Sequence, residues 1–253
     1  MLDDFTYGAY RDLIGRVRQG RENVCLGSFA AGPAPRRYFI LRHDVDFCPR
    51  RAEAMAALEA EMGVRATYFF LLSSPHYSLL AEPFCRTPRR IAAMGHEIGL
   101  HYDIDALASA AGAGKDELFR QQVEVLERVS GSEIAAVALH GPSFSGEGPP
   151  RGVDRFVDAY DPRFTREIAY VSDSAGAWRD ETFRALTGDD LPARLQLLIH
   201  PFFWGDDQAD RWVRLAQWAE ERRQWLAEAV RQAEGNWRIH PAVAEHDGRL
   251  KER

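Results

Sequence analysis

The sequence predicts a single domain of the α/β class, in which strands and helices alternate around a parallel sheet. Its 253 residues suit one domain of barrel size. Short apolar runs alternate with amphipathic stretches along most of the chain. His and Asp residues follow nearly every predicted strand. The carboxyl ends of parallel strands meet at one edge, so we expect the active site there.

The predicted elements of the first half begin with an apolar, aromatic strand at 37–42. Pro49 suits the first turn of the helix that follows, and Gly63 ends it. The run ATYFFLL predicts a second strand at 66–72, and a short capped helix follows at 87–94.

The second half continues this alternation. Four further short strands are predicted, at 97–100, 135–139, 168–171 and 195–199. An amphipathic helix is predicted at 116–129, and one long helix at 208–236. We therefore expect one domain over 1–253, with the 208–236 helix packed on it.

Composition limits the classes of function. Lys and Arg number 32 against 38 Asp and Glu, a formal charge of −6, which argues against a nucleic-acid partner. The three cysteines are too few and too scattered for a disulfide framework. We recognise no secretory signal and no apolar run of the ~20 residues that a transmembrane segment needs, so we expect a cytoplasmic protein. The oligomeric state stays open.

Two acidic residues follow the first predicted strand. Asp44 and Asp46 lie on the same side of the chain if it stays extended. Two close carboxylates repel each other unless a cation separates their roles. We expect one to hold a divalent metal and the other to act as a base; the alternative is a helix N-cap ahead of Pro49.

Other polar residues follow later strands. His101 and Asp105, four apart, would face the same way on a helical turn and could bind one metal, with Asp103 as a competing ligand in an extended segment. His200 is a candidate proton donor, which Asp173 could orient, although Asp173 could instead be a turn residue.

Six sequence blocks, taken together and in order, resemble the polysaccharide deacetylase (NodB-homology) family. They lie between about Tyr38 and Pro201 and read LRHDVDFCP, RATYFF, MGHEIGLHYD, LHGPSF, SDSAGAW and LLIHP. The residues in these blocks are most similar to those of the family branch found in bacterial O-antigen, lipopolysaccharide and other surface-polysaccharide biosynthesis.

The resemblance implies an irregular (β/α) barrel with fewer than eight full units. It implies a metal-dependent hydrolase that removes an N-acetyl or related acyl group from an amino sugar by cleaving an amide bond. Separately from the resemblance, the acidic composition and the lack of a recognised signal fit a sugar that is linked to a nucleotide or a lipid. The implied metal is zinc, with manganese, cobalt, nickel or iron as alternatives. The matched positions imply a base at Asp44, metal ligands at Asp46 and His101, and an acid at His200.

The same match places Asp173 and Trp178 in the block that supports the acid, and it has two departures. Asp105 stands where the family has its second metal histidine, which makes it the third expected ligand. His140 stands where the family has an arginine that steadies the base, so Arg42 or His140 must replace that arginine.

Substrate contacts are expected from residues at the same edge. We expect His140 to face the substrate, and Trp178, Tyr102 and Trp204 to stack on the sugar unless they belong to the core. Two other functions stay open: a hydrolase of cyclic amides or ureides on the same barrel, and a non-catalytic carbohydrate-binding relic, which Asp105 suggests.

Overall fold

The computed structural model describes residues 4–30, 35–109, 114–141, 149–178, 186 and 191–239. The chain divides into two compact units, Met1–Ala209 and Asp210–Arg253, and each is described by itself. The candidate functional residues all lie in the first unit.

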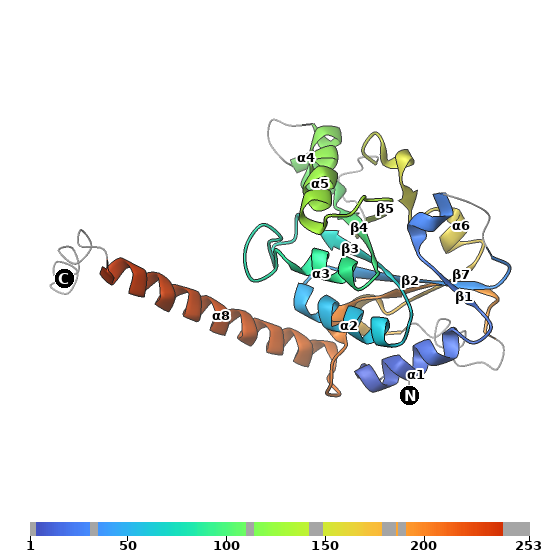
Figure 1. The fold of residues 1–253 in the computed structure, drawn as a ribbon, viewed down its shortest axis with the longest axis horizontal. Coiled ribbons are helices and arrows are strands. Elements are labelled where there is room, and N and C mark those ends of the chain that lie inside the picture. The colour runs from blue at the N-terminus through green and yellow to red at the C-terminus, as the bar shows by residue number, and fades with distance from the viewer. Residues whose placement is uncertain are drawn as a thin grey trace. The chain divides into compact units, whose positions relative to one another are not determined.

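The first unit is built on a parallel sheet (Figure 1). Its strands are β1 (Glu22–Val24), β2 (Tyr38–Val45), β3 (Thr67–Leu71), β4 (Glu97–Tyr102), β5 (Ala136–Leu139), β6 (Val157–Asp158), β7 (Ala169–Ser172) and β8 (Arg194–Ile199). The strand order is β6-β5-β4-β3-β2-β8-β7, and β1 pairs with the first half of β2. The order ends at β6 and β7, so the curled sheet is an incomplete barrel. The predicted fold class, an irregular (β/α) barrel with fewer than eight units, is confirmed.

Helices connect these strands, and all but α6, whose Phe164 packs in the interior cluster, cover one face of the sheet (Figure 1). They are α1 (Tyr7–Val17), α2 (Pro49–Glu61), α3 (Thr87–Ala93), α4 (Ile104–Ser109), α5 (Lys115–Ser130) and α6 (Pro162–Thr165). The six predicted strands and the helices predicted at Pro49, at 87–94 and at 116–129 are confirmed within a few residues. Helices α4 and α6 and the short strands β1 and β6 were not predicted, because brief elements leave little periodicity to detect. Helix α1, which has 11 residues, was also not predicted.

The two faces of the sheet have separate apolar clusters, as alternating strand side chains require. Phe39 and Leu41 of β2 pack toward the helices, whereas Tyr38 and Ile40 belong to the barrel interior. Gly99 of β4 leaves room for the Phe69 ring inside the barrel, since a Cβ atom at Gly99 would collide with that ring. The interior face is therefore filled by side chains up to the carboxyl ends of the strands.

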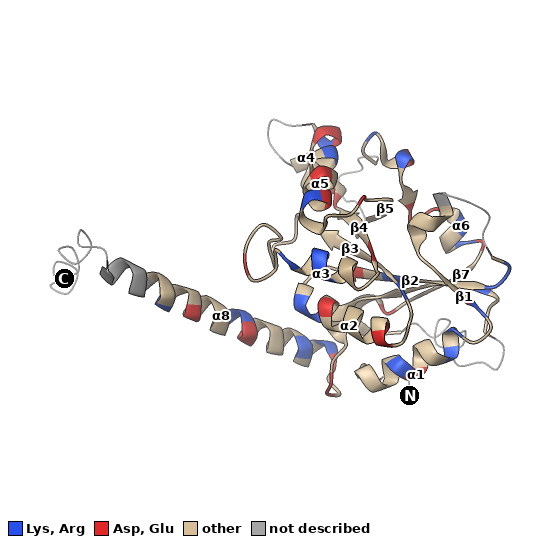
Figure 2. Cartoon of the chain, viewed as in Figure 1, with Lys and Arg blue, Asp and Glu red and all other residues tan. Residues whose placement is uncertain are grey.

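The second unit contains α8 (Arg211–Ile239), which confirms the long helix predicted at 208–236. Acidic and basic side chains form ion pairs one turn apart along it, including Glu220 with Arg223 and Glu228 with Arg231 (Figure 2). Among the described residues, no helix combines the length and the apolar character needed to cross a membrane. That α8 packs on the barrel remains a prediction.

Candidate active site

Strand alternation places the polar residues on the interior face at the carboxyl ends of the strands. Arg42 and Asp44 of β2 share the face of Ile40, and His101 of β4 shares the face of Gly99. His43 is the register partner of Ile199, so His200 follows beside Asp44 at the end of β8. Residues from strands far apart in sequence thus meet at one edge of the barrel.

Asp44 is held by Arg42 in a buried, two-pronged ion pair. The Nε and Nη2 atoms of Arg42 each donate to one Asp44 oxygen at 2.8 Å, and both side chains are almost inaccessible to solvent. The guanidinium carbon of Arg42 lies 4.3 Å from the Tyr160 ring centre and 5.3 Å from that of Phe69. Burial would raise the pKa of Asp44, but Arg42 and the nearby His101 lower it below its ordinary value. Asp44 is therefore a carboxylate, and Arg42 fills the role for which His140 was the other candidate.

The described part of the chain contains one group of side chains whose ligand atoms suit a metal ion: Asp46, His101 and His140. Their ligand atoms all lie within 4.8 Å of one another. Asp46 Oδ1 is 3.4 Å from His101 Nε2 and 3.5 Å from His140 Nδ1, and the two ring nitrogens are 3.1 Å apart. One carboxylate and two imidazoles are a donor set that zinc accepts.

The state of these donors also fits a cation. His101 Nδ1 donates to the Ala138 carbonyl at 2.9 Å, so its Nε2 lone pair faces the group. Burial lowers the pKa of His101, which favours this neutral form. Asp46 Oδ1 is buried and has no hydrogen-bond partner among the described residues. Such an oxygen is costly to bury unless something pairs with it, and a divalent ion would do so.

Asp105 does not join this group. The expectation for Asp105 required His101 and Asp105 to share a helical turn, and that conformation is wrong: His101 lies in the extended strand β4, while Asp105 lies in the first turn of α4. Asp103, the other candidate, accepts a hydrogen bond from the Ala106 backbone N–H and so caps α4. His140, and not Asp105, lies beside Asp46 and His101, and which residue completes a metal shell remains a prediction.

His200 is oriented by a buried carboxylate. Asp173 Oδ1 lies 2.7 Å from His200 Nδ1 and also accepts from the His200 backbone N–H, while Trp204 Nε1 donates to Oδ2 at 2.8 Å. This leaves His200 Nε2 directed toward Asp46, 3.9 Å from its Oδ2. Burial would lower the pKa of His200, but Asp173 and the carboxylates of Asp46 and Asp44 raise it to about 9.

The aromatic residues expected to stack on a sugar have other surroundings. Tyr102 is 2% exposed and packs in the core, and Trp204 is buried against Asp173. Trp178 is half-buried and stacks on Phe5. Burial of Tyr102 and Trp204 leaves their ring faces no room for a ligand.

Four other rings line the rim beside the polar group. Phe47, next to Asp46, lies between His76 at 4.3 Å and Phe202 at 4.6 Å, measured between ring centres. Phe203 packs on Phe202 and lies 6.1 Å from the His200 ring. Sequence analysis missed this aromatic wall (Phe47, His76, Phe202 and Phe203), although the adjacency of Phe47 to Asp46 and of Phe203 to His200 was a usable signal.

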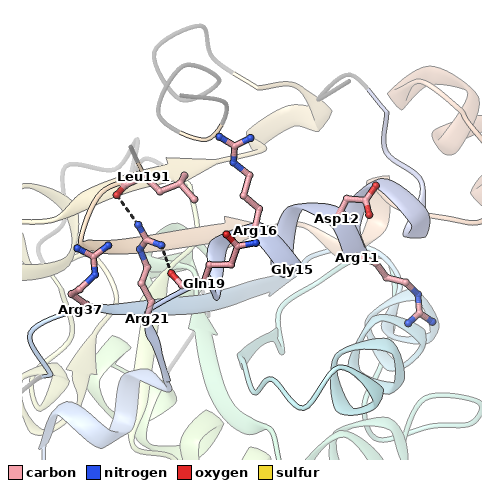
Figure 3. A pocket seen from close by; sticks show the side chains of 8 residues that line it. All are labelled: Arg11, Asp12, Gly15, Arg16, Gln19, Arg21, Arg37 and Leu191. Carbon is pink, nitrogen blue, oxygen red and sulfur yellow. Dashed lines mark hydrogen bonds between the residues drawn. The ribbon is translucent and has the colours of Figure 1, made fainter. Parts of the chain in front are cut away.

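An open cavity of about 840 Å³ lies elsewhere in the first unit, lined by Arg16, Arg21 and Arg37 among others (Figure 3). Arg37 directly precedes β2 and Leu191 precedes β8, so this cavity is at the amino-terminal edge of the sheet. The Arg21 guanidinium donates hydrogen bonds to backbone carbonyls there, including those of Leu191 and Pro192. The cavity is therefore separate from the candidate site at the carboxyl ends of the strands.

The third ligand can be tested by metal affinity. We expect His140→Ala to weaken zinc binding by at least about a hundredfold, because loss of a direct ligand should cost no less than loss of the groups that orient one. Asp105→Ala should stay within about threefold of the wild-type affinity. Competition with a chromophoric chelator measures both. The opposite order of effects would restore Asp105 as the ligand.

Comparisons with known proteins show only distant similarity. No family model matches the sequence, and no curated protein matches it. Solved structures that resemble it include peptidoglycan deacetylase PdaC from Bacillus subtilis, at 17% identity and a TM-score of 0.45 over 78% of this chain and 97% of that chain. A family 4 acetyl xylan esterase from Clostridium thermocellum with a cobalt ion is 14% identical, with a TM-score of 0.39 over 64% of this chain and 73% of that chain. The family 4 pseudoenzyme BA3943 from Bacillus anthracis is 12% identical, with a TM-score of 0.40 over 77% of this chain and 66% of that chain. Similarity this low assigns no activity, so the function must follow from the chemistry of the site itself.

Proposed function

We propose that the protein is a metal-dependent hydrolase that removes an N-acetyl or related acyl group from an amino sugar. The observation that carries this proposal is that a candidate base and a candidate acid flank one metal-ligand group. Asp44 Oδ2 lies 3.5 Å from His101 Nε2 on one side, and His200 Nε2 lies 3.9 Å from Asp46 Oδ2 on the other. Amide hydrolysis needs a proton acceptor and a proton donor in this relation.

The proposed roles follow from the protonation states. Asp46, His101 and His140 would hold the divalent ion, zinc in the first instance, which polarises the acyl oxygen and acidifies water. Asp44 takes a proton from the attacking water at its carboxylate, and Arg42 keeps that carboxylate ionised and oriented. His200 gives a proton from Nε2 to the departing amine nitrogen as the C–N bond breaks. Asp173 holds the ring at Nδ1 and stabilises its protonated form.

The aromatic wall supports an amino sugar as the substrate. Phe47, His76 and Phe203 are partly exposed at the rim, beside Asp46 and His200. Apolar C–H faces of a pyranose ring fit against such rings, while the polar group engages the acyl substituent. The finer proposal, a nucleotide- or lipid-linked sugar of O-antigen biosynthesis in the cytoplasm, rests on the sequence alone. The blocks suggest O-antigen biosynthesis, and the acidic composition and the lack of a recognised signal suggest the linked sugar and the cytoplasm.

The wall makes a prediction about affinity for the sugar. Replacing Phe203 by leucine keeps an apolar side chain but removes the flat ring, so we expect KM to rise about fivefold, equivalent to ~1 kcal/mol, while kcat changes less than twofold. Leu80→Ala, at an exposed position in the β3–α3 loop, is the control. A fall in kcat without a change in KM would assign Phe203 to the chemistry instead.

The proposed activity is tested by following both products. Zinc-loaded protein is incubated with UDP-N-acetylglucosamine or chitotetraose, and acetate and primary amine are measured together. We expect them in equal amounts, with loss on chelation and recovery on adding zinc. Turnover of dihydrouracil in place of the acetylated sugars would favour a cyclic-amide hydrolase. Absence of both turnover and metal binding would favour a carbohydrate-binding relic.

A further inference from the structure

A buried cluster of polar side chains lies on the other face of β2, behind Asp44. At its centre is the Glu59 carboxylate of α2, which accepts hydrogen bonds from the Tyr10 hydroxyl, from the Tyr68 hydroxyl at 2.7 Å and from His43 Nε2 at 2.6 Å. All four side chains are fully buried. Burying a carboxylate is expensive unless it is paired, and apolar residues would fill the same space at least as stably. General packing therefore does not explain this cluster.

The His43 ring bridges two acceptor oxygens. Its Nε2 faces the Glu59 carboxylate, and its Nδ1 lies 3.2 Å from the Ile199 carbonyl oxygen. Glu59 also accepts from two hydroxyls, and a carbonyl can only accept at Nδ1. Burial would raise the pKa of Glu59, but His43, His96 and the Tyr10 hydroxyl together lower it below its ordinary value, so Glu59 is a carboxylate.

The position of the His43–Glu59 pair connects it to the active site. His43 directly precedes Asp44 on β2, and Ile199 directly precedes His200 at the end of β8. His43 and Ile199 are also register partners in the sheet. The His43 ring thus joins the backbone next to the proposed base to the backbone next to the proposed acid, from the face opposite the substrate.

We propose that His43 and Glu59 form a positioning pair that sets the separation of Asp44 and His200, an inference that rests on the function proposed above. The Ile199 carbonyl is held by a directional hydrogen bond with His43 rather than by packing alone, and α2 anchors the His43 ring through Glu59. Catalytic groups misplaced by about 1 Å can lose a hundredfold in rate, so such a link acts on turnover without touching the substrate.

The test compares two ways of disturbing the same cluster. His43→Phe/Glu59→Gln removes the carboxylate and the link to Ile199, while the glutamine oxygen can still accept from one of the two tyrosine hydroxyls, Tyr10 or Tyr68. We expect kcat to fall at least about tenfold, with KM within twofold and zinc stoichiometry unchanged. The control, Tyr10→Phe, removes a hydrogen bond to Glu59 but leaves the link from His43 to Ile199. Its kcat should stay within twofold of wild type, even at an equal loss of thermal stability.

A second readout does not depend on turnover. In ¹⁵N-labelled wild-type protein, His43 Nδ1 should carry a proton that is hydrogen-bonded to the Ile199 carbonyl and exchanges slowly with solvent. The single variant His43→Gln, whose amide can still donate to one acceptor, should keep more of the wild-type kcat than the double variant. A His43 Nδ1 without a proton, or a double variant with unchanged kcat, would overturn the positioning pair. Wild-type protein that hydrolyses no acylated sugar would instead overturn the proposed function, so the two failures are distinguishable.

Discussion

We expect replacement of Asp44 by asparagine to lower kcat about a thousandfold, while the protein still binds one equivalent of zinc. The asparagine amide cannot accept the proton that the carboxylate takes from water, and general-base catalysis contributes roughly 10² to 10⁴ in rate. Asp46, His101 and His140 are unchanged by this substitution, so metal binding survives. Acetate release and metal analysis of the same preparation measure both effects.

The same substitution also tests the environment of the base. Arg42 would keep its charge in a fully buried position with only a neutral amide beside it, and its Nη1 already has no hydrogen-bond partner among the described residues. We expect the free energy of unfolding to fall by about 3 kcal/mol. Asp12→Asn, at an exposed position on α1, is the matched control and should change neither quantity. Undiminished turnover by Asp44→Asn would remove Asp44 from the role of base.

We expect replacement of Asp173 by asparagine to lower kcat about a hundredfold and to shift the alkaline limb of its pH profile to lower pH. Asp173 is the main source of the raised pKa of His200, at about 9. A group with a raised pKa is protonated below that pKa and loses its proton as pH rises through it, so His200 is an acid across the neutral range. Without the carboxylate the pKa of His200 falls, because burial then opposes the charged ring with less compensation, and the acid is lost at a lower pH.

Two comparisons separate this effect from general damage. Ser174→Ala alters the exposed neighbour of Asp173 and should leave the pH profile in place. Asp173→Asn also offers fewer acceptor oxygens to the backbone of His200 and to Trp204, so some loss of stability is expected. If kcat falls but the alkaline limb stays where it is, Asp173 supports the fold and not the acid.

The sequence allowed the sheet and much of the site to be predicted, because both depend on strand periodicity. Apolar runs located six strands, and the parallel arrangement placed the residues after them at one edge. Asp44 and Asp46 were expected on one side of an extended chain, and the observed strand β2 supplies that extension through Val45. The long helix at the end of the chain followed from its apolar spacing.

What could not be predicted depends on contacts between distant segments. Whether Asp105 or His140 lies beside the other candidate metal ligands depends on where β4 ends, and the sequence does not define that boundary to within one or two residues. Spacing alone also could not show that the Trp204 side chain donates a hydrogen bond to Asp173, whereas the neighbouring Phe203 lies at the rim of the site. The pairing of His43 with Glu59 requires α2 to lie against β2, which no local pattern encodes.

The proposed function requires one divalent ion, held by Asp46, His101 and His140, for acyl hydrolysis. Metal-free protein titrated with zinc, with acetate release measured at each addition, tests it most directly. We predict that activity starts near zero, rises linearly and levels off at one equivalent, and that Asp46→Ala shows no rise at any addition. Full activity in the metal-free protein would contradict the requirement for a divalent ion.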